Sequence, residues 1–171
     1  MNNHMRVGIF VENEYQELEF WYPYLRLREE GIKPLIIGAE KKTYKSKLGY
    51  EVQAEVAASS VEHDSFSAII IPGGYAPDKM RVHQPYLNLI KNTFDRGAVV
   101  AAICHAAWVL ISAKVVSGKK ATCYHTIRDD LKNAGAEYLD EAVVVDGNLI
   151  TSRKPDDLPV FCQKIIEGLK K

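Results

Sequence analysis

Short apolar runs alternate along this chain with longer stretches of helical periodicity. Four of these runs predict buried strands: residues 6–11, 34–38, 67–71 and 98–101. Between them, residues 15–30 and 86–96 repeat apolar positions at helical spacing and are each followed by a glycine, which predicts two helices. Strands that alternate with helices are typical of a mostly parallel sheet covered by helices on both faces.

The first predicted helix depends on Leu18, Tyr22 and Leu25, which are spaced as apolar residues of one helix. Pro23 lies inside this pattern. Because proline has no N–H group, the carbonyl of Glu19 loses its usual partner. We therefore expect the helix to kink or to begin irregularly near Pro23.

The second half of the chain predicts shorter elements. Asp146-Gly147-Asn148 separates two alternating runs, which predicts a hairpin of residues 142–145 and 149–152. Residues 44–57 predict an excursion or hairpin at the sheet edge, and residues 121–124 predict a short strand. Residues 127–134 predict a helix, and residues 155–171 predict a final helix.

Length and charge limit the classes of function. A chain of 171 residues with 47% hydrophobic residues can bury one sizeable core, so we expect one domain over residues 1–171. Lys plus Arg and Asp plus Glu number 22 each, so we expect no nucleic-acid partner. The apolar stretch 98–113 is shorter than the ~20 residues of a membrane-spanning helix and contains His105, so we expect no membrane partner.

Cysteine and histidine spacing bears on compartment and cofactors. The cysteines form no CxxC pair and the N-terminus lacks a secretory signal pattern, which predicts a reducing, cytoplasmic location. Cys123 and Cys162 lie in apolar patterns and are expected to be structural. The histidines show no metal-ligand spacing with other candidate ligands, so we expect no metal and no other cofactor. His4, His63 and His83 are expected at surface or loop positions.

The segment Ala102–Ala107 places Cys104 directly behind an apolar run, where a strand turns into a helix. A similar turn, Gly-x-Ser-x-Gly, carries the nucleophile of α/β hydrolases, although cysteine and alanine stand here for serine and glycine. Helix N–H groups and the helix dipole would favour the thiolate, so we expect a reactive Cys104 with a lowered pKa. In parallel sheets ligands bind at the carboxyl ends of strands, where residues 12–19, 72–74 and 104–105 converge.

Several motifs in this order resemble the PfpI intracellular protease group of the DJ-1/PfpI superfamily. They are Ile71-Pro72-Gly73-Gly74, Ala102-Ile103-Cys104-His105, Lys132-Asn133-Ala134-Gly135-Ala136, Val144-Val145-Asp146-Gly147-Asn148 and Thr151-Ser152-Arg153. The resemblance implies an α/β three-layer sandwich with a mostly parallel sheet, flavodoxin-like and of the class I glutamine amidotransferase type. It also implies a homo-oligomer, at least a dimer and often a hexamer or ring.

The resemblance also implies roles for particular residues. Cys104 matches the nucleophile and His105 the histidine beside it. Asp78 matches the acidic member of the triad, which reaches the site from a neighbouring subunit. Glu19 matches a carboxylate that contacts the sulfur. The backbone N–H groups of Gly74 and His105 match the oxyanion donors.

The chain departs from the family pattern beside the nucleophile. Ala106-Ala107-Trp108 replaces the usual Gly-Pro-Gln, so we expect the Trp108 indole near the mouth of the site. His125 stands where the family often has proline after the residue equivalent to Tyr124. With Gly73, these residues are expected to line the pocket, and substrate preference is the property that transfers least from the family.

The predicted pairs have chemical consequences. A carboxylate and a thiolate in contact are like charges, so one of Glu19 and Cys104 must hold a proton. We expect Glu19 to stay protonated and to donate a hydrogen bond to the thiolate. His105 needs a partner that orients it, and Asp78 of a second subunit is the candidate.

Three functions fit this site. The first is a cysteine hydrolase resembling the PfpI peptidases, with Cys104 as nucleophile. The second is a glyoxalase or deglycase that acts on methylglyoxal or its adducts through the same thiol. The third is a redox sensor or chaperone-like stress protein in which Cys104 is oxidised. A glutaminase is excluded because it needs a late His-x-Glu pair and no histidine follows His125.

Overall fold

A seven-stranded sheet forms the centre of the computed structural model, which describes residues 5–171 and leaves His4 outside the described residues. The strand order is β10-β11-β7-β6-β1-β2-β5. Every pair is parallel except the pair of β10 and β11. In chain order the strands are β1 (Val7–Val11), β2 (Leu35–Gly38), β5 (Val56–Ala57), β6 (Ala68–Ile71), β7 (Val99–Ile103), β10 (Val143–Asp146) and β11 (Leu149–Ser152).

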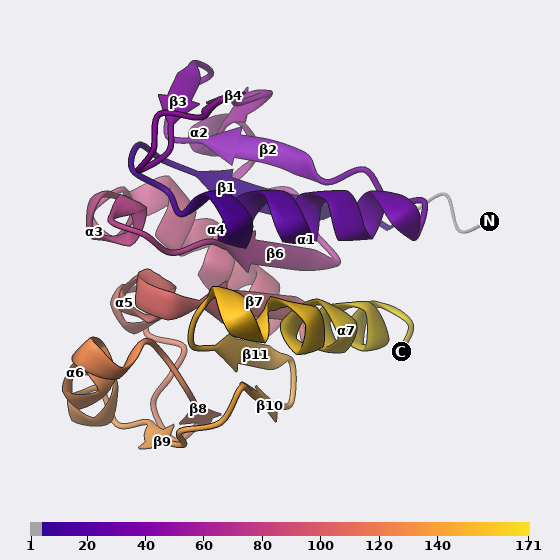
Figure 1. Ribbon diagram of the computed structural model, residues 1–171. Coiled ribbons are helices and arrows are strands. Elements are labelled where there is room, and N and C mark those ends of the chain that lie inside the picture. Colours follow the sequence, from indigo (N-terminus) through magenta and orange to yellow (C-terminus); the bar gives the residue numbers. More distant parts are fainter. Residues whose placement is uncertain (1–4) are drawn as a thin grey trace.

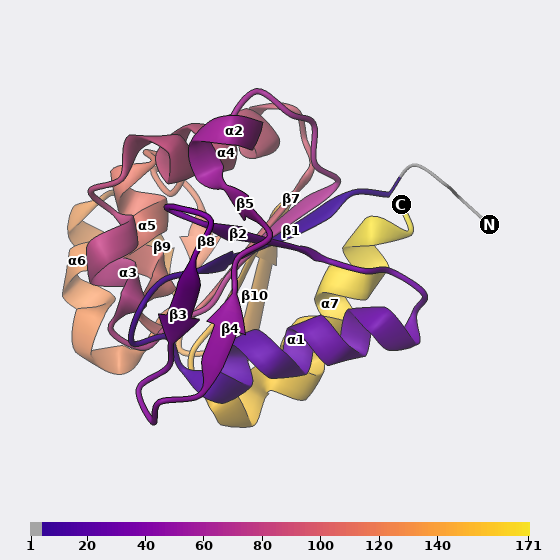
Figure 2. The same cartoon turned by 90° about the horizontal axis from the view of Figure 1, so that it is seen from above.

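Helices cover both faces of this sheet (Figures 1 and 2). One face carries α1 (Glu17–Glu29) and α7 (Leu158–Leu169), and the other carries α2 (Ala58–Val61) and α4 (Gln84–Asp95). Shorter helices follow the strand ends: α3 (Ala76–Met80), α5 (Ala107–Ser112), α6 (Arg128–Asn133) and the 3₁₀ turns η1 (Cys104–Ala106), η2 (His125–Ile127) and η3 (Pro155–Asp157). The predicted α/β sandwich with a mostly parallel, flavodoxin-like sheet is confirmed.

The central strands are buried because both faces of the sheet are covered, and apart from Thr151 and Ser152 of β11 they carry no polar side chain. Every residue of β1, β6, β7 and β11 is buried. This is the usual reason why parallel strands read as continuous hydrophobic runs. Among residues 5–171, no helix is long and apolar enough to cross a membrane.

Two smaller sheets complete the structure. The strands β3 (Thr43–Lys45) and β4 (Glu51–Gln53) form the predicted hairpin beside the edge strand β5. The strands β8 (Lys120–Ala121) and β9 (Glu137–Tyr138) pair in parallel. The strand predicted over 121–124 therefore ends at Ala121, and the following residues form the loop that approaches the site.

The buried face of α1 differs from the pattern that predicted the helix. Leu18, Tyr22 and Leu25 are 55%, 38% and 52% exposed. The buried residues are instead Glu19, Phe20, Pro23, Tyr24 and Leu27. Aromatic rings provide the reason, because Phe20 and Tyr24 stack on each other and bury more apolar surface than the leucines would. The helix also continues through Pro23 without a break, so the expected irregularity there is wrong.

Candidate active site

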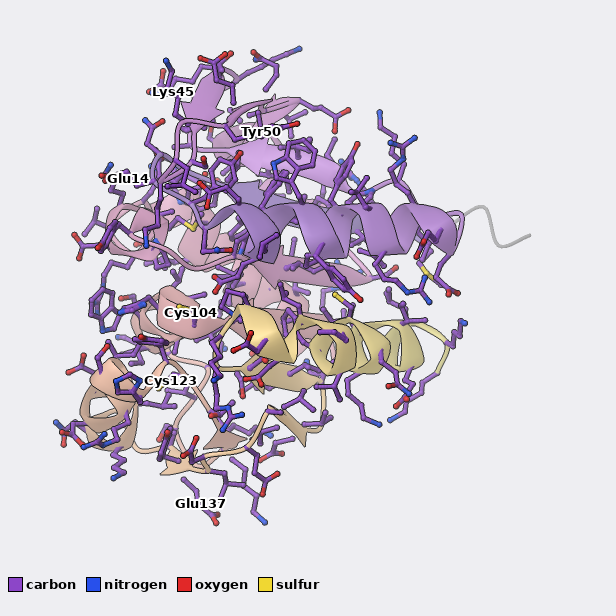
Figure 3. The ribbon with its side chains drawn as sticks, viewed as in Figure 1. Glu14, Lys45, Tyr50, Cys104, Cys123 and Glu137 are labelled. Carbon is purple, nitrogen blue, oxygen red and sulfur yellow. The ribbon has the colours of Figure 1, made fainter. Side chains whose placement is uncertain are left out.

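The three segments expected to converge do meet at the carboxyl edge of the sheet. The N–H of Gly73, after β6, donates to Glu19 Oε2 of α1 at 2.8 Å. The N–H of Gln16 donates to the Gly73 carbonyl at 3.2 Å. Cys104 lies at the start of the helix that follows β7, on the same side of the molecule as α3 (Figure 3). One carboxyl, one glycine turn and one thiol therefore form a single cluster.

Glycine is required at both positions of the turn. A Cβ on Gly73 would lie 2.5 Å from Glu19 Oε2 and 2.7 Å from Cys104 Cβ. Gly74 has φ +84°, and its Cβ would lie 2.5 Å from the backbone oxygen of Glu14. The turn can approach Cys104 this closely only because it carries no side chains.

Cys104 has a left-handed backbone with φ +64°. Such a conformation costs a residue other than glycine roughly 1–2 kcal/mol. The N–H of Tyr124 donates to the Cys104 carbonyl at 3.2 Å and helps to hold this turn. The residue is only 8% exposed, so its thiol lies at the bottom of the site. This geometry is that of a nucleophile elbow.

The pKa values of Glu19 and Cys104 are coupled. Burial raises the pKa of Glu19 to about 7, against hydrogen bonds from the Gly73 N–H and the Cys104 thiol, and within the described residues its Oε1 has no hydrogen-bond partner. Burial and the charge of Glu19 raise the pKa of the Cys104 thiol to about 12, against N–H groups of Gly74 and His105 that lower it. The expected lowering of the thiol pKa is therefore wrong, because burial, the largest cause of the raised pKa, acts whether or not Glu19 is ionised. When Glu19 takes up a proton, the second cause disappears and the carboxyl becomes a donor to the sulfur.

The His105 imidazole contacts the Cys104 thiol, although adjacency in the sequence does not by itself require this contact. Its Nδ1 is 3.3 Å from Sγ, and its Nε2 is 3.4 Å from Oγ1 of Thr126. Burial lowers the pKa of His105, with smaller contributions from the charges of Lys47 and His125. The imidazole is therefore neutral at neutral pH and has one lone pair to offer as a base.

Aromatic rings hold the His105 ring on two sides. Tyr124 stacks on it with 5.1 Å between ring centroids, and Trp108 packs edge to face at 5.2 Å. The Trp108 indole N–H donates to Asp130 of α6 at 2.8 Å, which fixes the indole. His125 is exposed and packs on the far part of Tyr124, 4.5 Å between centroids. Trp108 and Tyr124 thus border the histidine directly, and His125 acts on it at longer range.

The remaining predicted residue, Asp78, lies on α3 with an exposed side chain. Two residues near the site were not predicted from the sequence. Thr126 contacts His105 from η2, and Lys47 places its ammonium 4.7 Å from the Tyr75 ring, from where its charge lowers the pKa values of Glu19 and His105. Neither residue belongs to a recognisable sequence motif, and only the folding of the chain brings them to the site.

The other two cysteines take no part in the contacts described above. Cys123 and Cys162 are buried, and burial raises the pKa of each thiol to about 12. The pKa of Cys104 is raised as far, so the difference lies in its surroundings: its sulfur contacts His105 Nδ1 at 3.3 Å, a neighbour that can take the thiol proton. Within the part of the chain that the structure describes, no group of three or more His, Cys, Asp and Glu side chains is arranged to hold a metal ion.

A strained cysteine at the carboxyl edge of a parallel sheet, with a histidine and a buried carboxyl beside it, defines the class of α/β proteins with a cysteine elbow. The chain belongs to the DJ-1/PfpI family, whose profile matches residues 5–168. Deglycase PfpI of Pyrococcus furiosus is 40% identical over 166 residues, which cover 97% of this chain and 100% of that protein.

Two further comparisons agree with this assignment. Protein/nucleic acid deglycase 2 of Escherichia coli is 37% identical over 167 residues, which cover 96% of this chain and 97% of that protein. The crystal structure of Drosophila melanogaster DJ-1beta has a TM-score of 0.91 at 31% identity and covers 96% of this chain and 90% of that chain. The family resemblance read from the sequence motifs is therefore confirmed.

Proposed function

We propose that this protein is a cysteine-dependent enzyme that acts on small α-oxoaldehydes, such as methylglyoxal, and on their adducts with amines. One observation carries the proposal: the Cys104 thiol is 8% exposed, contacts His105 Nδ1 at 3.3 Å and lies beside the buried Glu19. A thiol this deep in the site favours a small carbonyl compound over a peptide bond held in an extended chain. The deglycase names of two relatives also support it.

The reaction uses groups that the site already contains. Sγ adds to the aldehyde carbon, the thiol proton goes to His105 Nδ1, and the imidazolium returns it to the alkoxide, which gives a hemithioacetal. A proton then moves from the former aldehyde carbon to the adjacent carbonyl carbon, and the hydroxyl proton of the hemithioacetal moves to the oxygen of that carbonyl, which gives a 2-hydroxy thioester. Glu19 is the carboxyl beside the sulfur that could accept and return the proton of the former aldehyde carbon. Water hydrolyses the thioester to a 2-hydroxy acid and restores the thiol.

Peptide hydrolysis is the second candidate, and the contact between Cys104 and His105 favours it. The same imidazole could protonate a leaving amine after Sγ attacks the amide carbon. The N–H groups of Gly74 and His105, which both act on the sulfur, could hold the oxyanion. A redox or chaperone-like role would need only the oxidation of Cys104, without turnover.

A substrate panel on the wild type and on Cys104→Ser separates these functions. We expect methylglyoxal and glycated amines to be consumed by the wild type, and we expect peptides to be cleaved far more slowly. The variant should be inactive on every substrate. Turnover of aldehydes that survives Cys104→Ser would disprove the proposal, and selective oxidation of Cys104 by mild peroxide with no turnover would favour the redox role.

We also propose that the protein is a homo-oligomer in the cytoplasm. What supports assembly is the exposed apolar surface of α1, at Leu18 and Leu25, together with the exposed carboxylate of Asp78 on α3. In such an assembly Asp78 of one subunit would lie near the site of the next. Three free cysteines in the chain suit a reducing compartment.

A further inference from the structure

The two ring nitrogens of His105 face two different groups. Nδ1 is 3.3 Å from Cys104 Sγ, and Nε2 is 3.4 Å from the hydroxyl oxygen of Thr126. A neutral imidazole carries one N–H and one lone pair, so the group at one nitrogen determines what the other can do. A hydroxyl oxygen is a better hydrogen-bond acceptor than a thiol sulfur, so the single N–H is favoured on Nε2, facing Thr126, and this leaves the lone pair on Nδ1, facing the thiol.

We propose that Thr126 is a positioning residue that holds His105 in the tautomer with the proton on Nε2. In this tautomer the hydroxyl oxygen accepts the Nε2–H, and the Nδ1 lone pair faces the thiol as a base. When the thiol proton moves to Nδ1, the Nε2–H remains and the same hydroxyl still accepts it. One hydrogen bond thus serves both states of the histidine.

The local structure places the hydroxyl for this role. Thr126 lies in η2, which begins directly after Tyr124. The N–H of Tyr124 donates to the Cys104 carbonyl at 3.2 Å, so the loop is attached to the nucleophile itself. The Tyr124 ring also stacks on the imidazole at an interplanar angle of 29°. The ring plane and the hydroxyl are thereby fixed by the same short segment.

This inference deepens the proposed function, on which the assignment of His105 as the base rests. It also gives the histidine an orienting partner within its own chain. Asp78 of a second subunit remains the competing partner for Nε2, and the experiment below separates the two.

The experiment compares Thr126→Val with Thr126→Ser. Valine has nearly the shape of threonine and no hydroxyl, whereas serine keeps the hydroxyl. Because Thr126 is exposed, we expect both variants to fold with urea midpoints close to that of the wild type. Side-chain ¹⁵N NMR, with His105→Gln to assign the signals, reports the tautomer. The rate of Cys104 alkylation by iodoacetamide, followed by mass spectrometry, reports the thiol without any substrate.

We expect the Nε2–H tautomer in the wild type and in Thr126→Ser. In Thr126→Val we expect a mixture of tautomers and a fall of about 3- to 10-fold in kcat/KM for methylglyoxal and in the alkylation rate. An unchanged tautomer and rate in Thr126→Val, or an Nδ1–H tautomer in the wild type, would overturn the inference. If Asp78→Asn alone shifts the tautomer, the second subunit orients His105 and the inference is wrong. A wild type that does not turn over methylglyoxal overturns the proposed function only, because tautomer and alkylation still test Thr126.

Discussion

At the residue scale, Glu19 controls the charge of the site. It is fully buried on a helix whose exposed side carries leucine and tyrosine, which reverses the usual distribution of apolar and charged residues. One carboxyl oxygen accepts the Gly73 N–H, and the other, Oε1, has no hydrogen-bond partner among the described residues. A carboxyl in this environment keeps its proton to a higher pH than a solvated one.

The raised pKa of Glu19 predicts a stability effect that depends on pH. The pKa of the native carboxyl is about 7 against an ordinary value of 4.5, so the native state binds more protons between these values. The stability that Glu19 contributes is therefore present below about pH 4.5 and is lost as the pH rises through about 7. Glu19→Gln cannot ionise and keeps an oxygen for the Gly73 N–H. Its free energy of unfolding relative to the wild type should rise between about pH 5 and pH 8, by up to the order of 3 kcal/mol.

Urea unfolding of both proteins at the two pH values measures this difference. Glu17→Gln is a matched control on the same helix. Partial burial raises the pKa of Glu17, but hydrogen bonds from Ser46 and from the backbone N–H of Leu48 outweigh it, so the net pKa is lowered. Its stability contribution is present at high pH and is lost as the pH falls. A Glu19→Gln difference that does not change with pH would show that Glu19 stays ionised throughout.

At the element scale, the turn after β6 lies between Glu19 of α1 and Cys104, which directly follows β7. It is stiff because backbone atoms of the loop after β1 pack directly on it. The N–H of Tyr75 donates to the Glu14 carbonyl at 3.0 Å, and Tyr15 and Gly74 form a β-bridge. Three separate parts of the chain thus share one rigid wall of the site.

Gly73→Ala tests this arrangement. The added methyl would overlap Glu19 Oε2, Cys104 Cβ and the Ile103 carbonyl oxygen, all within 3.0 Å. We expect a loss of about 1–3 kcal/mol in the free energy of unfolding and a strong loss of Cys104-dependent turnover. Gly168→Ala on α7 is the control, because its methyl meets only side-chain atoms at 3.0 Å and 3.6 Å and alanine favours a helix. A Gly73→Ala enzyme with normal turnover would contradict the requirement for a bare backbone there.

At the scale of the whole molecule, the proposed assembly into oligomers would determine whether the site is complete. Asp78 lies on α3 and its side chain is exposed to solvent. If Asp78 of a neighbouring subunit completes the site, activity per subunit falls when the assembly dissociates.

We therefore expect turnover per subunit to fall on dilution in step with the loss of the oligomer measured by analytical ultracentrifugation. Asp78→Asn should lower turnover at protein concentrations where the oligomer is intact, while leaving its sedimentation unchanged. Asp64→Asn, which removes a surface ion pair with Arg6, is a control expected to change neither. Full turnover by a dissociated monomer would exclude a role for a second subunit.

Local signals in the sequence were sufficient for much of this protein. The apolar runs predicted the central strands because both faces of a parallel sheet are covered, and Cys104 was predicted as a nucleophile because a strand-to-helix turn exposes one side chain. Which side of α1 packs on the sheet could not be predicted, because the spacing of three apolar positions does not distinguish a helix that buries its leucines from one that buries its aromatic rings.

What the sequence by itself determined is the set of elements, the family and the identity of the thiol, since these depend on periodicity and on short motifs. Only the tertiary structure decided the charge and the orientation of the site. The pKa of Glu19 depends on its burial between α1 and the Gly73 turn, and the contact of His105 with Thr126 depends on a loop that lies 21 residues further along the chain. Electrostatic and hydrogen-bond energies depend on the distances between atoms in the folded chain, and the order of residues alone does not give these distances.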